Sequence, residues 1–282
     1  MGRNIAISAL ALFLLSCNTA SSEFAACASS NIVLMPHHLI VQPYIDEMYK
    51  VLTAQRPSKI IIISPDHFYS GSAAISASEE IEHGFTIHRN LALQYFGKLP
   101  IEGYMIRINA KENDLIELAE QLSKENTLFI FSIDFSHYLD GKIARIHDLM
   151  SHDVIESRSI DDAKNLEVDS PGSVEVMLRL LALLNEKMIV YKNTNPSLDA
   201  GVESFTNTTH LFACSSAGTP PTRQVLTTMY FEHSREWYLG KTQEDRYLYG
   251  YDETVFNTGE QDHAKVEHSS QSSEEESFAY FK

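Results

Sequence analysis

The sequence predicts an α/β fold in which helices flank a central, mostly parallel sheet. Runs of β-branched and apolar residues recur along the chain, and each is followed by a segment whose apolar residues recur at helical spacing. These runs are continuous rather than alternating, which is typical of strands that helices cover on both faces. The chain is 44% hydrophobic, and the part after its first apolar run is long enough for one large core. We therefore expect a single main domain.

The expected elements follow in chain order. Strands are predicted at residues 31–35, 59–63, 127–133 and 187–191, with weaker candidates at 72–76 and 103–108 and a last strand at 209–215. Helices are predicted at residues 43–55, 113–124, 141–157 and 173–185. Gly218 to Pro221 then breaks the chain, so the α/β domain is expected to span residues 28–218.

The first residues predict export. Arg3 precedes an apolar run at residues 5–15 that is too short to span a bilayer, which is typical of a signal peptide covering residues 1–16. The run ends in the letters LLSC, which resemble a bacterial lipobox, where cleavage before the cysteine leaves a thiol for acylation. We therefore predict an exported lipoprotein of the cell envelope, held to the membrane only by a lipid on Cys17. A plain secretory signal cut near Ala26 is the alternative.

Two segments follow the expected domain. Residues 219–256 are rich in aromatic side chains and are expected to pack on the domain edge, but the sequence assigns them no function. Residues 257–282 are polar, acidic and rich in Ser, which predicts a disordered tail. His263 and His268 lie in this tail and are expected to be solvated rather than to bind metal.

Charge and cysteine content limit the partners. The formal net charge is −16, which argues against nucleic acid and anionic lipid because both require clustered Lys and Arg. Besides Cys17 the chain has only Cys27 and Cys214, so there is no framework of several disulfides. These two can pair in an oxidising compartment, but their spacing leaves the question open.

Residues able to bind metal follow the strongest expected strands directly. Ligands of open α/β sheets bind outside the carboxyl ends of strands, so three strands that deliver His or Asp to one edge predict a single shared site. Two imidazoles and one carboxylate suit a divalent ion such as non-haem Fe(II) and leave coordination positions open. The segments concerned are Pro36-His37-His38, Pro65-Asp66-His67 and Asp134-Phe135-Ser136-His137.

The third ligand is open on the pattern alone. Asp169, Asp199 and His210 are the candidates, and Asp169 has an alternative role as the cap of the helix that follows it. His210 opens an apparent strand and is equally consistent with a packed side chain. His147 and His152 lie on an expected helix and are interpreted as structural or exposed.

Four motifs, in order and spacing, resemble those of the Memo family. They are Pro36-His37, the Ser64-Pro65-Asp66-His67 turn, Glu82-His83, and the segment SIDFSHYL at residues 132–139. This family includes the bacterial AmmeMemoRadiSam system protein B and is structurally similar to class III extradiol dioxygenases. The resemblance covers about residues 30–218 and implies an extradiol-dioxygenase-like single domain.

The resemblance also implies roles. His37 and His67 would be metal ligands, and Asp169 is preferred over Asp199 because Asp169-Ser170 stands where the family usually has a Cys-Gly pair whose Cys completes the site. Glu82, His83, Asp134 and His137 would line the pocket, with His137, oriented by Asp134, relaying a proton. For His83 the alternative is a surface residue in a loop.

Departures from the family pattern bear on the metal. A carboxylate in place of a thiol hardens the site, which favours Fe(II), Mn or Zn over Cu(I). We therefore expect Fe(II) as the cofactor, with Cu or Zn as alternatives. The family's usual Ala-Gly-Tyr after the first His is replaced here by His38-Leu39-Ile40.

Three functions are compatible with these expectations. The first is a metal-dependent oxidoreductase, related to extradiol dioxygenases, that acts on a small molecule. The second is a non-catalytic lipoprotein that uses the same cleft to bind a peptide or a metal. The third is a Zn-dependent hydrolase, since catalytic zinc also uses three protein ligands.

Overall fold

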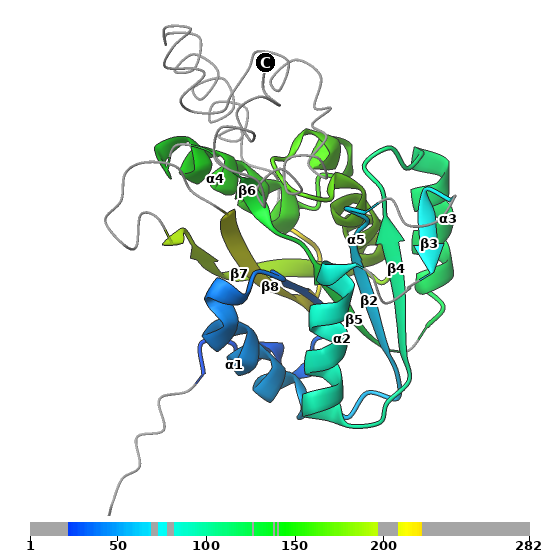
Figure 1. Ribbon diagram of the computed structural model, residues 1–282. Helices are drawn as coiled ribbons and strands as arrows, with labels where there is room; N and C mark the ends of the chain where they lie inside the picture. Colours follow the sequence, from blue (N-terminus) through cyan, green and yellow to red (C-terminus); the bar gives the residue numbers. More distant parts are fainter. Residues whose placement is uncertain are drawn as a thin grey trace, which may run out of the picture.

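The computed structural model describes residues 22–68, 73–77, 82–125, 127–137, 139, 141–196 and 208–221 (Figure 1). The expected signal peptide, Cys17, Asp199, almost all of the aromatic extension and the acidic tail lie outside the described residues. Among the helices that are described, none is both long and apolar enough to cross a bilayer.

An eight-stranded sheet forms the centre of the molecule, in the order β3-β4-β2-β5-β1-β8-β6, with β7 paired to β8. The four neighbouring strands β4, β2, β5 and β1 are parallel, whereas β3, β8, β6 and β7 pair antiparallel. The predicted α/β class with a mostly parallel central sheet is therefore confirmed. The strands are β1 (Ile32–Met35), β2 (Ile60–Pro65), β3 (Ile75–Ala77), β4 (Ile101–Ile106), β5 (Leu128–Ser132), β6 (Phe135–His137), β7 (Glu186–Thr194) and β8 (Thr208–Ala217).

Helices cover both faces of the sheet (Figure 1). Successive side chains of a strand point to opposite faces, and in β2 this sends Ile60 and Ile62 into one core and Ile61 and Ile63 into the other. The first core packs against α1 (Gln42–Leu52) and α2 (His83–Phe96). The second packs against α3 (Glu112–Leu122), α4 (Gly141–Ser157), α5 (Pro171–Leu183) and the short helix η3 (Ile160–Asn165). Burial on both faces explains why the central strands are continuously apolar.

Helix α2 and strand β6 were not predicted from the sequence, and neither were the short helices η1 (Ala25–Ser29), η2 (Leu39–Val41) and η3. Helix α2 fills a stretch to which no element was assigned, and its buried positions Phe85, His88 and Leu91 have helical spacing. His88 occupies a core position, where the hydroxyl of Tyr49 and the carbonyl oxygen of Pro36 bind its two ring nitrogens. Because histidine is not counted as an apolar residue, the apolar residues alone do not show the helical spacing of this stretch. Strand β6 was missed because it has only three residues.

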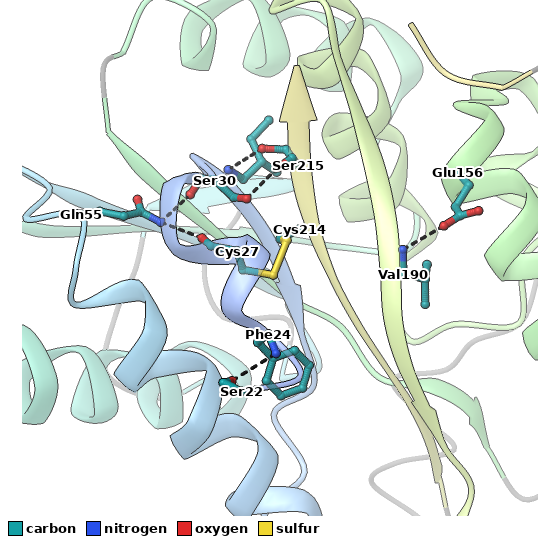
Figure 2. The surroundings of a disulfide bond; sticks show 10 residues. Ser22, Phe24, Cys27, Ser30, Gln55, Glu156, Val190, Cys214 and Ser215 are labelled. Atoms are coloured by element: carbon teal, nitrogen blue, oxygen red, sulfur yellow. Dashed lines mark hydrogen bonds between the residues drawn. A yellow bond between two sulfur atoms is a disulfide. The ribbon is translucent and has the colours of Figure 1, made fainter. Parts of the chain in front are cut away.

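A disulfide joins the amino-terminal segment to the sheet. Cys27, in the short helix η1 (Ala25–Ser29), pairs with Cys214 of β8, which settles the question that the spacing left open (Figure 2). Gln55 donates hydrogen bonds to the carbonyl oxygens of Cys27 and Ser30 at 3.2 and 2.8 Å. Both half-cystines are buried, as is Phe24, so the core begins before residue 28.

Candidate metal centre

Three neighbouring strand ends build the candidate site. β2, β5 and β1 are adjacent and parallel, so their carboxyl ends meet at one edge of the sheet. His37 follows β1, His67 follows β2 and Asp134 follows β5. Asp169 arrives from elsewhere in the chain, because Val168 forms a bridge to Phe135 and the Asp169 N–H donates to the Asp134 carbonyl oxygen at 3.2 Å.

The side chains of these residues converge. His37 Nε2 lies 3.4 Å from Asp169 Oδ2 and 3.3 Å from Asp134 Oδ2, and His67 Nε2 lies 3.8 Å from the same Asp169 oxygen. All four residues are at least 96% buried. Two atoms that bind one ion at about 2.1 Å in tetrahedral geometry are themselves separated by about 3.4 Å. The spacing therefore fits a set of ligands around one ion.

The hydrogen bonds of His37 fix its tautomer. The Ser132 hydroxyl donates to the carbonyl oxygen of Gly84 at 2.9 Å, so its single proton is used there. The contact of 3.1 Å between Ser132 Oγ and His37 Nδ1 must then be donated by the ring. Because Nδ1 carries this proton, the neutral ring presents the lone pair of Nε2 to the two carboxylates.

Glu82 acts on His67 in the same way. Its carboxylate accepts from His67 Nδ1 at 2.9 Å and from the His67 backbone N–H at 2.8 Å, which turns Nε2 of that ring toward Asp169. Glu82 also caps α2 by accepting from the Gly84 N–H. Burial by itself would raise the pKa of Glu82, but its bond to His67, the charges of His67 and His83 and the Gly84 N–H together hold this pKa below its ordinary value.

The donor set fits a divalent cation. Metal-binding histidines usually donate their second ring nitrogen to a carboxylate or a similar acceptor, as His67 does to Glu82 and His37 does to Ser132. Glu82, Asp134 and Asp169 place three carboxylates in a buried space, and such charge requires positive compensation. Two imidazoles and a carboxylate are the ligands that Fe(II), Zn and related ions use.

His83 lies at the solvent-exposed edge of this cluster. It is the first residue of α2 and therefore does not lie in a loop, although it is partly exposed at the surface as the alternative expected. Its side chain is 41% exposed, and its ring stacks on that of His67 with centroids 4.6 Å apart and meets the ring of His37 edge-on at 4.9 Å. The ring of Phe68, which is itself exposed, meets that of His83 edge-on with centroids 5.9 Å apart.

His137 is buried on β6, next to β8, and its role as a proton relay stays a prediction. Asp134 contacts His37: Oδ1 accepts from the His37 backbone N–H at 3.1 Å, and Oδ2 lies 3.3 Å from Nε2 of the His37 ring. His38 points to β8, where its Nδ1 lies 3.3 Å from Nε2 of the fully buried His210.

The remaining candidates separate clearly. Asp169 does not cap α5, because the cap is Ser170, whose hydroxyl accepts from the Ser173 N–H. Asp199 lies outside the described residues. His147 is buried in α4, and His152 is 41% exposed beside Glu156, as the interpretation of structural or exposed residues implied.

Two contributors were not singled out from the sequence. Ser132, at the end of β5, orients His37, and its signal was a polar residue within an apolar strand. Gly84 allows α2 to approach the site, since a Cβ there would lie 3.2 Å from His37 Nδ1 and 3.3 Å from Ser132 Oγ. No sequence pattern reveals that close approach.

No protein-family model matches the chain, and no curated protein matches it. The fold and the site therefore define the class of protein: an α/β protein with a buried histidine and carboxylate cluster at the carboxyl ends of its parallel strands.

Proposed function

We propose that this protein is a Memo-like metal-binding protein that holds one divalent ion on His37, His67 and Asp169, with Fe(II) preferred. The observation that carries the proposal is the approach of both histidine Nε2 atoms to one oxygen of Asp169, while their Nδ1 atoms are held by Ser132 and Glu82. Such support of the ligands by a second layer of hydrogen bonds is typical of metal centres.

The reaction class we propose is oxygen chemistry on a small molecule, related to that of the extradiol dioxygenases. Bound at this site, Fe(II) would supply Lewis acidity and electrons for dioxygen chemistry. The chain's own residues support that role: Glu82 and Ser132 fix the two ring tautomers, and Asp134 adds a second carboxylate beside His37. His83 is the part of the cluster that a substrate reaches first, because its side chain is exposed.

We also propose export and a lipid anchor at Cys17. A disulfide between Cys27 and Cys214 is typical of an oxidising compartment. Cleavage near Ala26 would remove Phe24, which is fully buried and packs on Phe212 with ring centroids 5.5 Å apart. Cleavage before Cys17 would keep this contact, and therefore the packing favours the lipoprotein over the plain secretory signal.

The test is a metal titration on protein that lacks residues 1–17. Anaerobic Fe(II), Mn(II), Zn(II) and Cu binding is measured for the wild type, for a His37→Ala/His67→Ala double variant and for His152→Ala. His152 is a matched control because it is an exposed histidine on α4. We expect one ion per chain in the wild type and in His152→Ala, and loss of binding in the double variant.

The results would rank the functions. Tight Fe(II) binding together with oxygen uptake in the presence of candidate phenolic substrates supports the oxidoreductase. Zn(II) bound much more tightly than Fe(II), with ester or amide hydrolysis, supports the hydrolase instead. Equal metal binding by the wild type and the double variant would refute the proposed site.

A further inference from the structure

The cluster contains more possible ligands than one ion of a single type needs. Two groups of side chains each bring their ligand atoms within 4.8 Å of one another: His37, His67 and His83 form one, and His37, Asp134 and Asp169 form the other. The first group offers only imidazole nitrogen, whereas the second is mostly carboxylate. His37 belongs to both, so the two groups share one residue and lie side by side.

We propose that His83 is an exchangeable metal ligand: ions that favour nitrogen, such as Zn(II) and Cu(II), draw it onto the centre, whereas the harder ion Mn(II) binds without it. The inference rests on the proposed metal site and adds to it a residue that selects the metal. It follows from the position, the exposure and the chemistry of His83.

The position of His83 is set by its backbone. Glu82 caps α2 directly before it, so the main chain of His83 is anchored in the first turn of the helix. The ring lies against both proposed histidine ligands, stacked on His67 and edge-on to His37. Only side-chain rotation is therefore needed to bring a ring nitrogen to the centre.

The exposure of His83 differs from that of its neighbours. The side chains of His37 and His67 are 2% and 1% exposed and are held by buried partners, whereas the side chain of His83 is 41% exposed. Atoms bound to one ion at about 2.1 Å lie no more than about 4.2 Å apart, so the three rings must converge to bind one ion. A partly exposed side chain is bounded by solvent on one side, so its rotation displaces less of the packed interior than rotation of His37 or His67 would.

The contact with Glu82 orients His83. Its Nδ1 lies 3.2 Å from Glu82 Oε1, the same oxygen that accepts from His67 Nδ1. A proton held on Nδ1 beside this carboxylate would leave the lone pair on Nε2, which is the form of imidazole that binds metal. One carboxylate oxygen therefore faces Nδ1 of both rings.

The chemistry explains why the ligand would be exchangeable. Imidazole suits Zn, Cu, Fe and Ni, whereas carboxylate and water suit Mn and other hard ions. An ion of the first kind gains by replacing water with His83, and an ion of the second kind is already served by Asp169 and Asp134.

The test compares His83→Gln with the wild type and with His152→Gln, a histidine of equal side-chain exposure on α4. Zn(II) and Mn(II) dissociation constants are measured by competition with a chromophoric chelator, and Cu(II) is examined by electron paramagnetic resonance. We expect His83→Gln to weaken Zn(II) binding at least about 10-fold and to leave Mn(II) within about 2-fold, as for the loss of one ligand or its support. The nitrogen hyperfine pattern of Cu(II) should also lose one nitrogen.

Unchanged Zn(II) affinity, or an equal loss for Zn(II) and Mn(II), would overturn the inference while leaving the proposed metal site intact. A wild type that binds neither ion would overturn both. The circular dichroism spectrum and the urea midpoint of His83→Gln are recorded to show that the variant is folded, and His83→Ala serves as a second variant.

Discussion

Removing the disulfide between Cys27 and Cys214 should destabilise the protein by about 5 kcal/mol. The bond closes a loop with a sequence separation of 187 residues, and the chain-entropy relation for such a loop gives about 5 kcal/mol at 25 °C. With a urea m-value of about 3 kcal/mol/M, the unfolding midpoint should fall by about 1.7 M on reduction.

The assay is equilibrium unfolding in urea, followed by circular dichroism, of protein lacking residues 1–17. Both half-cystines are buried, so the bond is reduced in the unfolded state and the protein is refolded with reductant present. The control is a Cys27→Ala/Cys214→Ala double variant, which should unfold near the reduced wild type and should not respond to reductant. A midpoint shift below about 0.3 M would refute the reasoning, because it would mean that the cross-link does not restrict the unfolded chain.

Three further changes test individual side chains. Glu82→Gln keeps a hydrogen-bond acceptor for His67 but removes the negative charge. Metal affinity, measured by chelator competition, should therefore fall about 10- to 100-fold. An unchanged affinity would mean that the Glu82–His67 hydrogen bond does not support metal binding. Gly84→Ala puts a methyl group 3.2 Å from His37 Nδ1 and should weaken metal binding about 10-fold in the same assay, and an unchanged affinity would mean that the close approach of α2 does not position the ring. Burial lowers the pKa of His88 to about 4, so its neutral form is favoured in the fold while the unfolded chain takes up a proton below its ordinary pKa of 6.5. Stability is therefore full above pH 6.5 and should fall by about 2 kcal/mol between pH 7.5 and pH 5, a loss that His88→Gln should remove from the urea unfolding curves.

The edge of the sheet that carries the site was predictable because a local pattern coincides with a general rule. Apolar runs identify β1, β2 and β5, and the carboxyl ends of parallel strands meet at one edge. His37, His67 and Asp134 could therefore be placed together without knowing the order of the strands.

Other parts of the site depend on long-range contacts that leave no local trace. Asp and Ser are both residue types that cap helices, so the sequence alone does not show which of Asp169 and Ser170 caps α5. In the structure Ser170 takes the cap position, and the side chain of Asp169 faces His37. In α2, His88 stands at a core position because Tyr49 and Pro36 satisfy its ring, and neither partner is near it in sequence. When histidine is classed as a polar residue, the pattern of core positions in α2 is broken at His88, and the helix that begins at His83 is therefore not predicted.

The disulfide also has a mechanical consequence. His37, His67, Glu82, Asp134 and Asp169 all lie between Cys27 and Cys214 along the chain, inside the covalent ring that this bond closes. A pulling force applied to residues before Cys27 and after Cys214 would pass from one sulfur to the other instead of running through the strands that hold these side chains. The centre is thus shielded from tension that is applied on either flank.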